Sequence, residues 1–483
     1  MARPSIWKNG LLNALRILCS LLFPLITFPY VSNILDISDI GRYDFSYAFV
    51  QYFITIATFG SAVYGTREGA VAYSRSKEEY SKFASEVFSL NLLTGAASFV
   101  LLMGCLLLIP RLGEYADFLL LFSLMIVFNV VGVEWVYTSR ADYAFITIRA
   151  IAFQVVSLFL MFLLIHTPDD FLLYGFITVF ASAGSSLLGF FHARKYCRFQ
   201  LPKPRAVFRH FAPMAIIFVS LAANVVYVNS SSVLLGFLSS NQEVGQFGLA
   251  MKAYRAISKV AMAFTTVAIP LMAVYFSNRD YEALTSTVSN LFRRMALIAF
   301  PCVAILVALS DQVILLLSTP SYLDASPTIK ILAMAVPFCL LAYLYGQCVL
   351  IPMNKEKTVL AVTVAVALFN VASNLVLIPH FGKNAAAFSL VASEFLTFFI
   401  YYLYIRRSVP LKGIFPCLVK SGIGALGVYG VCSAMSVFVA DPLACLFSSV
   451  ALSVLLYSAV ELFAKNSAML EIASAIRKRV VRR

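Results

Sequence analysis

The sequence has 483 residues, of which 61% are hydrophobic and only 12% are charged. Soluble domains contain about 45–50% apolar and about 25% charged residues, so this composition excludes an ordinary soluble enzyme and indicates a polytopic membrane protein. In such a protein the formal net charge of +14 reflects the orientation of the loops, and no nucleic acid is expected as a partner.

Stretches of about 20 apolar residues predict membrane-spanning helices, because that length crosses the hydrocarbon core of a bilayer. Fourteen predicted spans follow one another along the chain: 10–35, 40–65, 83–109, 117–138, 145–166, 171–192, 209–238, 244–275, 288–318, 326–352, 357–379, 384–405, 414–439 and 443–464. We therefore expect an all-α fold with about 14 transmembrane helices.

The segments between the predicted spans differ in charge. Most of the 37 Lys and Arg residues fall in alternate segments that begin with the amino terminus. Because basic loops stay on the cytoplasmic side, this bias predicts that both termini are cytoplasmic and that the number of spans is even. The outer segments are short and offer no domain for an enzyme site, so we expect a transporter and not an enzyme.

Charged residues occur in or beside the first two spans. Arg16 is predicted to lie about 10 Å from the inner surface, where it could snorkel to the interface or line a lumen. Arg42 and Asp44 begin the second span at the outer surface. They form either a surface pair or a gate.

Glu134 and Arg149 lie on either side of the turn between the fourth and fifth spans. A carboxylate near the interface could be solvated, but the apolar flanks of Glu134 favour a buried partner. Arg149 is a candidate partner because it begins the next span on the same side.

The longest polar linker, residues 193–208, follows the sixth span and carries two prolines. It is predicted to join two six-helix lobes. The predicted parts are an amino-terminal lobe (1–192), this cytoplasmic linker (193–208), a carboxy-terminal lobe (209–405), an additional helix pair, the thirteenth and fourteenth spans (406–464), and a basic cytoplasmic tail (465–483).

An internal repeat supports two lobes of parallel topology. Placing Gly41 of the second span on Gly245 of the eighth also aligns Tyr43 with Phe247. The match is confined to a few positions, but both segments are second in their six-helix unit and run in the same direction. Two such lobes would enclose a central lumen.

The eighth span, Val244–Tyr275, carries Lys252, Arg255 and Lys259. Spacings of three and four residues place these cations on one helical face. Arg255 lies roughly 16 Å from the start of the span, near the membrane midplane. A cation there costs roughly 3 kcal/mol, so it should face a polar cavity unless it pairs with a carboxylate; the two lysines could also snorkel. A cationic lumen indicates an anionic cargo.

Glu394 lies deep in the twelfth span. It is the best candidate for a protonatable coupling group, because burial favours the neutral form of a carboxyl group; a salt bridge to one of the cations is the alternative. The sequence has no nucleotide-binding motif and no metal-ligand spacing. No cofactor is therefore expected, and H⁺ or Na⁺ remains as the coupling ion.

Three stretches carry a family resemblance. Asn13–Ala70 resembles the amino-terminal region of bacterial Wzx-type O-antigen flippases, which belong to the multidrug/oligosaccharidyl-lipid/polysaccharide (MOP) exporter superfamily. Gly132–Ile151 looks like the turn between helices four and five of that family. Asn370–Glu394 resembles its eleventh and twelfth helices, with an Asn-x3-Asn and an Ile-Pro-x2-Gly pattern. The usual Gly-Ala-Ala reads Lys-Asn-Ala at 383–385, and fourteen helices, unlike the usual twelve, resemble lipid II flippases.

The resemblance implies alternating access by two lobes in the bacterial inner membrane. It implies a polyprenyl-diphosphate-linked oligosaccharide as cargo, surrounding membrane lipids, and a glycan polymerase as a candidate partner. A diphosphate needs cations in a cavity of low dielectric constant. The candidate ligands of the diphosphate are Arg255, Lys252, Lys259 and Arg16. The rival functions are a multidrug or small-molecule antiporter of the same superfamily and a membrane glycan polymerase or ligase.

Overall fold

The structure is a computed structural model that describes residues 6–266, 268–410, 414–471 and 474. All regular secondary structure in these residues is helical. The chain divides into two compact units, Met1–Gly245 and Gln246–Arg483. Most of the predicted basic tail, at 472–473 and 475–483, lies outside the described residues.

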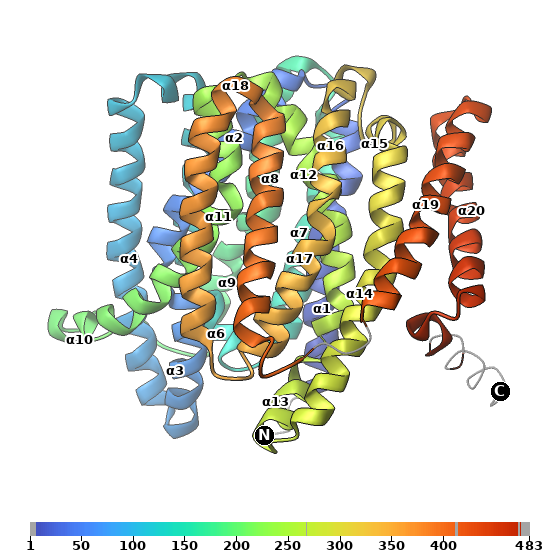
Figure 1. The fold of residues 1–483 in the computed structure, drawn as a ribbon. Helices are drawn as coiled ribbons and strands as arrows, with labels where there is room; N and C mark the ends of the chain where they lie inside the picture. Colours follow the sequence, from blue (N-terminus) through green and yellow to red (C-terminus); the bar gives the residue numbers. More distant parts are fainter. Residues whose placement is uncertain (1–5, 267, 411–413, 472–473, 475–483) are drawn as a thin grey trace. The chain divides into compact units, whose positions relative to one another are not determined.

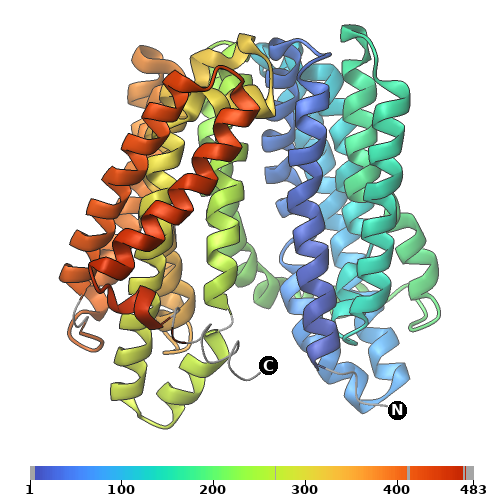
Figure 2. The ribbon, with the colours of Figure 1, turned by 90° about the vertical axis from the view of Figure 1, so that its right-hand side faces the viewer.

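The helices of the first unit begin at α1 and end at α11 (Figure 1). They are α1 Ile6–Val31, α2 Ile37–Thr58, α3 Ser61–Arg75, α4 Lys77–Leu108, α5 Ala116–Val131, α6 Glu134–Thr138, α7 Tyr143–Leu164, α8 Phe171–Val179, α9 Ser185–Ala193, α10 Pro204–Phe208 and α11 Phe211–Leu238. A π-helical segment, η3 Phe180–Gly184, joins α8 to α9. Figure 2 shows α1 beside α7, where Tyr30 Oη donates to the Ile165 carbonyl at 2.7 Å.

The second unit begins within α12. Its helices are α12 Asn241–Thr266, α13 Ile269–Ser277, α14 Tyr281–Ala308, α15 Ser310–Leu317, α16 Ser326–Ala333, α17 Ala335–Tyr343, α18 Glu356–Ile405, α19 Ile414–Phe438 and α20 Pro442–Phe463. A second π-helical segment, η5 Leu344–Leu350, follows α17. The pair α19 and α20 packs on α14 through a shared apolar cluster.

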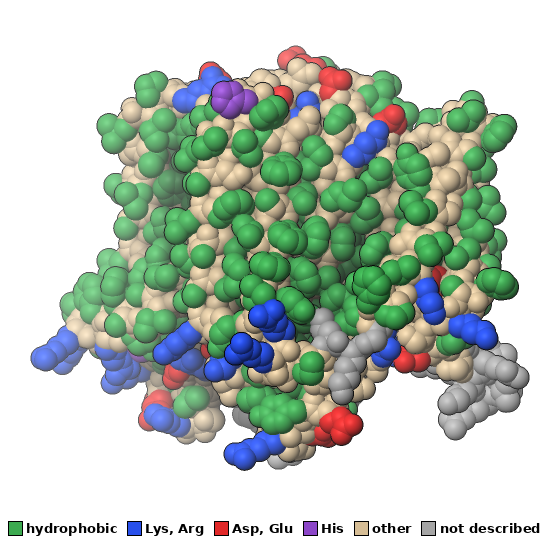
Figure 3. Space-filling view, viewed as in Figure 1, with side chains coloured by type: hydrophobic (Ala, Val, Ile, Leu, Met, Phe, Trp, Pro, Cys, Tyr) green, Lys and Arg blue, Asp and Glu red, His purple; other side chains and the backbone are tan. Residues whose placement is uncertain are grey.

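Eleven helices of the described residues are long and apolar enough to cross a membrane, or twelve if the bent pair Pro320–Ala333 and Ala335–Leu350 is one span. Figure 3 shows hydrophobic side chains over the helix walls and most charged side chains at the helix ends. This distribution matches an apolar bilayer core between two aqueous interfaces. The chain is therefore a multi-pass membrane protein.

Helix α18 contains two predicted spans, 357–379 and 384–405. Its backbone breaks at Gly382, where φ is 54° and ψ is −134°, a conformation that is essentially restricted to glycine. Hydrogen bonds join its two arms, from Asn370 Nδ2 to Ser393 Oγ at 3.0 Å and between the hydroxyls of Ser373 and Ser389 at 2.8 Å. Helix α18 is therefore a helical hairpin, as the turn between the two predicted spans requires.

Several predicted spans are wrong as single helices. The span 40–65 forms α2 and α3, separated at Phe59 and Gly60, whose φ angles are 45° and 80°. The span 117–138 breaks at Val133, with φ of 40°. Left-handed backbone cannot continue a right-handed helix. The span 244–275 forms α12 and α13, and Pro270 lies in the first turn of α13, where its missing N–H costs nothing.

The predicted cytoplasmic loop between the second and third spans is helical. Helix α3 continues to Arg75, and α4 begins at Lys77. Ser76 separates them, and its side chain accepts a hydrogen bond from the Glu79 backbone N–H at 3.0 Å, which is a capping interaction. A search for apolar stretches does not find this helix because it carries many charged residues, although the Ser-x-x-Glu pattern is a helix-start signal.

The boundary between the compact units also differs from the predicted linker. Helix α11, predicted as the first helix of the second lobe, packs on α2 of the first unit. The first residue of α12 is also held there, because Tyr115 Oη donates to Asn241 Oδ1 at 2.6 Å. The predicted division into two six-helix lobes was based on the order of the spans along the chain. The compact units are defined by packing, so this division stays a prediction.

Candidate functional site

Helix α12 places Lys252, Arg255 and Lys259 along one side of a continuous helix. Lys252 and Arg255 are half-buried, and Lys259 is exposed. Like charges at such spacings destabilise a helix by about 0.2–0.5 kcal/mol per pair, so an anion beside this stripe would be stabilising. The spacing therefore builds a potential anion-binding face within one helix.

The buried side of α12 lies next to the cationic stripe. Phe247, Tyr254, Ser258 and Ala261 are buried and recur at intervals of seven, four and three residues. Arg255 directly follows Tyr254, so its side chain is rotated about 100° from the buried row. The cations therefore border the packed face of the helix.

Glu394 lies on the second arm of α18 and is buried, with 8% of its surface exposed. Tyr254 Oη donates to Glu394 Oε1 at 3.4 Å, which is long for such a bond. The sequence did not reveal Tyr254 as a partner, because the two residues are 140 positions apart. The bond links Glu394 to the residue directly before Arg255, so Glu394 and the α12 cations share one neighbourhood within the second unit.

In the first unit, Arg16 of α1 forms an ion pair with Glu134 at the start of α6. Arg16 also donates from Nη2 to Asn13 Oδ1 at 3.3 Å. The predicted partner of Glu134 was Arg149, yet the ion pair is made with Arg16. Arg16 reaches Glu134 because α1 packs along α7, the helix that carries Arg149.

Arg149 of α7 is buried, with 8% exposed. Its Nε and Nη1 atoms have no hydrogen-bond partner among the described residues. The guanidinium carbon lies 5.6 Å from the centre of the Phe145 ring, within the range of a cation–π contact. A Cβ on Gly189 would lie 2.0 Å from Nη1, so that glycine makes room for the guanidinium. Arg16, Arg149 and Glu134 together carry one net positive charge.

Arg42 of α2 is held by several groups. Its guanidinium contacts Asp39 at 3.0 Å and Asp117 at 3.4 Å, and its Nε donates to the Glu114 carbonyl at 2.9 Å. Asp44 is half-buried on the same helix. Arg42 thus pairs with Asp39 and Asp117, and the choice between a surface pair of Arg42 with Asp44 and a gate stays a prediction.

No cluster of three or more His, Cys, Asp or Glu side chains that could hold a metal ion occurs in the part of the chain that the structure describes.

The family described as "Polysaccharide biosynthesis protein" matches residues 6–276, from α1 to α13. The chain belongs to the polysaccharide biosynthesis protein family. The matched region contains every predicted site residue except Glu394. This match confirms the resemblance that the sequence carries in Asn13–Ala70 and Gly132–Ile151.

Two relatives of this polysaccharide biosynthesis protein are named as candidate O-antigen transporters. One, from Escherichia coli (strain K12), is 23% identical over 391 residues, or 80% of this chain and 93% of the relative. The other, from Shigella dysenteriae, is 23% identical over 396 residues, or 80% of this chain and 97% of the relative.

Solved structures share the fold of the polysaccharide biosynthesis protein. The lipid II flippase MurJ, in an inward closed conformation, aligns with a TM-score of 0.73 and 16% identity, over 95% of this chain and 99% of that chain. An inward-facing multidrug resistance MATE family transporter of the MOP superfamily aligns with a TM-score of 0.64 and 14% identity, over 82% and 95%. At these identities the likeness concerns the fold alone.

Proposed function

We propose that the protein is a flippase that moves a polyprenyl-diphosphate-linked oligosaccharide, such as an O-antigen repeat unit, across the membrane. The family and the named O-antigen transporters among its relatives support this class of cargo. Those relatives are named as transporters, so the protein is a transporter and not an enzyme. The observation that carries the proposal is the row of three cations on α12, a helix of a membrane protein that is 61% hydrophobic.

The cations on α12 are the proposed ligands of the diphosphate. Arg255 offers a planar guanidinium that can bind two phosphate oxygens, whereas Lys252 and Lys259 offer point charges. Arg16 ranks last, because its guanidinium already pairs with Glu134. Arg149, predicted as a coupling or gating residue, is a further candidate ligand of the diphosphate, because its Nε and Nη1 atoms have no hydrogen-bond partner among the described residues. The prenyl chain would remain in the bilayer.

The finer features of transport are also part of this proposal. We place the protein in the bacterial inner membrane with both termini cytoplasmic, and we assign transport from the cytoplasmic to the outer leaflet by alternating access. Counting α18 as two spans and adding α12 to the twelve gives the fourteen spans of the proposed topology. Glu394 is assigned a role in coupling to H⁺ or Na⁺, and a glycan polymerase is the proposed partner.

The decisive experiment deletes the gene in its own organism and identifies the glycan lipid that accumulates in the inner leaflet. Complementation with wild type should restore surface glycan, and Arg255→Ala should not, at equal membrane levels of the two proteins. Arg407→Ala removes an exposed arginine after α18 and should behave like wild type. Normal glycan display with Arg255→Ala would remove the α12 cations from the mechanism. Loss of organic-cation export without any glycan defect would support the antiporter alternative.

A further inference from the structure

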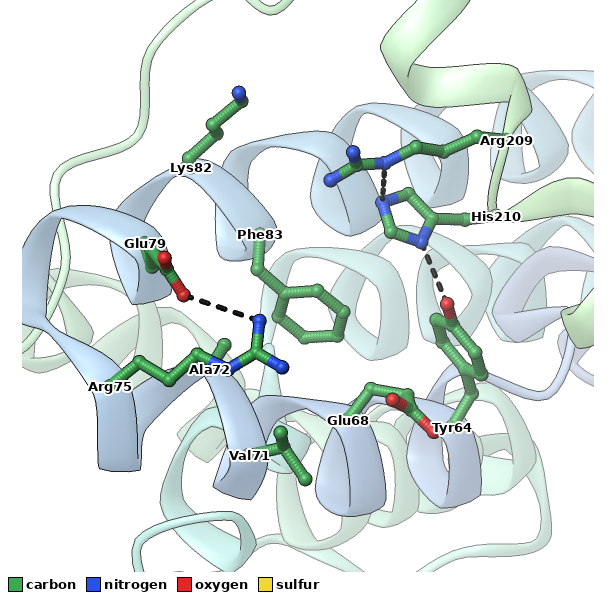
Figure 4. A pocket seen from close by; sticks show the side chains of 10 residues that line it. All are labelled: Tyr64, Glu68, Val71, Ala72, Arg75, Glu79, Lys82, Phe83, Arg209 and His210. Atoms are coloured by element: carbon green, nitrogen blue, oxygen red, sulfur yellow. Dashed lines mark hydrogen bonds and ion pairs between the residues drawn. The ribbon is translucent and has the colours of Figure 1, made fainter.

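A polar pocket of about 360 Å³ lies within the first unit, between α3, the start of α4 and the junction of α10 with α11 (Figure 4). Its charged and titratable lining residues are Tyr64, Glu68, Arg75, Glu79, Lys82, Arg209 and His210. The pocket is separate from the residues assigned above to cargo binding. In the proposed topology it opens on the cytoplasmic side.

His210 is buried at the edge of this pocket, with 5% of its surface exposed. Its Nδ1 atom lies 2.8 Å from Tyr64 Oη, and its Nε2 atom lies 2.9 Å from Glu86 Oε2. Figure 4 shows the Tyr64 hydroxyl directed at the imidazole from one side and the Arg209 guanidinium on the other. Both ring nitrogens are therefore held in fixed positions.

Glu86 of α4 lies behind His210 and is fully buried. Its Oε2 atom also accepts a hydrogen bond from Arg209 Nη2 at 2.5 Å. Its Oε1 atom has no partner among the described residues. A buried carboxylate oxygen without a donor is unfavourable, so this group gains from additional positive charge nearby.

The Nε2 atom of His210 meets both a donor and an acceptor. Arg209 Nε can donate to it at 3.3 Å, and Glu86 Oε2 can accept from it at 2.9 Å. When Nε2 carries the proton, it donates to Glu86 while Nδ1 accepts from the Tyr64 hydroxyl. Nδ1 then carries the lone pair of the ring that can take up a proton.

The charged groups around His210 come from three elements. Helix α3 contributes Glu68 and Arg75, α4 contributes Glu79, Lys82 and Glu86, and the α10–α11 junction contributes Arg209. Arg75 is paired with Glu79 at 3.6 Å. Burial lowers the pKa of His210 below its ordinary value, the hydrogen bond to Glu86 raises it, and the charge of Arg209 lowers it further. The imidazole is therefore neutral at neutral pH and becomes charged in acid.

We propose that His210, with Glu86 and Tyr64, forms a proton-binding site that is reached from this pocket and couples proton uptake to flipping. The coupling rests on the proposed function. A solvent proton binds to the lone pair of Nδ1, and the Tyr64 hydroxyl turns from donor to acceptor. The imidazolium then lies between Tyr64 and the Glu86 carboxylate, and no other bond is formed or broken.

Proton binding strengthens contacts across three helices. Tyr64 belongs to α3, Glu86 to α4, and His210 immediately precedes α11. The imidazolium attracts the carboxylate more strongly than the neutral ring does. The start of α11 follows the basic linker, so the protonated site clamps the end of that linker to α3 and α4.

Direct titration tests the site. The chain has four histidines, so the ring carbon signals of ¹³C-histidine-labelled protein in nanodiscs can be assigned by single substitutions. The His210 signal should titrate with a midpoint below about 6.5. Glu86→Gln should lower this midpoint, and Arg209→Gln should raise it. Arg209 is half exposed, so its variant should fold even if Glu86→Gln does not. A His210 signal that does not titrate between pH 4 and 8, or a midpoint indifferent to Arg209→Gln, would overturn the site.

Flipping by proteoliposomes tests the coupling. A transmembrane pH gradient should accelerate transport of lipid-linked oligosaccharide by wild type, and His210→Asn should reduce this acceleration at least fivefold. His380→Asn removes an exposed histidine and should keep the full acceleration. Equal acceleration in wild type and His210→Asn would overturn the coupling. If wild type flips nothing while His210 titrates as expected, the proposed function fails and the proton-binding site stands.

Discussion

Gly41 of α2 and Gly245 of α12 lie face to face. A Cβ on Gly41 would stand 3.0 Å from the Gly245 nitrogen, and a Cβ on Gly245 would stand 3.3 Å from the Gly41 nitrogen. The backbones come closer still at neighbouring residues, since the Gly41 Cβ would be 1.8 Å from the Asn241 carbonyl oxygen. The positions that the internal repeat equates are thus in direct contact, and both depend on the absence of a side chain.

Gly41→Ala should destabilise the protein. The obstructing atom belongs to the backbone of Asn241, so the two helices must move apart, and overpacking of this kind costs about 1–3 kcal/mol. Thermal unfolding of the detergent-purified variant should show a lowered midpoint. Gly104→Ala in α4, where a Cβ meets nothing within 4 Å, is the matched control and should be neutral or stabilising. An unchanged midpoint for Gly41→Ala would contradict the close approach.

Gly382→Ala should disrupt the α18 hairpin. The backbone there has φ of 54° and ψ of −134°, which costs about 1–3 kcal/mol for a residue with a side chain. The variant should lose yield and thermal stability. Gly430→Ala in α19 adds a methyl group in open space and should gain up to about 1 kcal/mol, as expected for an exposed helix position. Similar stability of the two variants would rule out the break at Gly382.

Arg255→Lys should reduce flipping less than Arg255→Ala does. Lysine keeps the charge but loses the two-pronged geometry for phosphate oxygens. For Arg255→Lys we expect the flipping rate to fall about tenfold, which corresponds to a loss of about 1.4 kcal/mol of interaction with the diphosphate. Flipping of labelled lipid-linked oligosaccharide in proteoliposomes measures the rate. Arg407→Lys serves as the control, and a wild-type rate for Arg255→Ala would exclude a role in cargo binding.

Glu394→Gln should weaken the dependence of transport on the H⁺ or Na⁺ gradient while leaving the protein folded, because the amide has the size of the carboxyl group. Tyr254→Phe removes the hydroxyl that donates to Glu394 and should alter the same dependence to a smaller extent. Transport at several gradient strengths provides the measurement. Glu282→Gln, at an exposed position in α14, is the control. Identical gradient dependence in wild type and Glu394→Gln would exclude Glu394 from coupling.

The features that could be predicted from sequence are those set by local pattern. Apolar windows located the helices, and the spacing of Lys252, Arg255 and Lys259 placed them on one side of α12 because a helix repeats every 3.6 residues. The turn at Gly382 was also predictable, since Ile378-Pro379 and Phe381-Gly382 interrupt the apolar run.

Partners that are distant in the chain could not be predicted. Glu134 was matched with its sequence neighbour Arg149, but folding pairs it with Arg16, which is 118 residues away. Glu86 and His210 were not among the predicted site residues, because their contact exists only in the folded chain. Their contact joins residues 124 positions apart, and no local periodicity reports such a distance.

The π-helical segments η3 and η5 change the register of the helices that contain them. Each wide turn holds one residue more than an α-helical turn, so side chains beyond it are swung by about 100° relative to an uninterrupted helix. Deleting one residue from Leu344–Leu350, the segment whose Tyr345 ring stacks on Phe398, would restore an α-helical turn and leave the side chains after it in their present orientations. Alignments of homologous chains should therefore admit a single-residue gap at these two places.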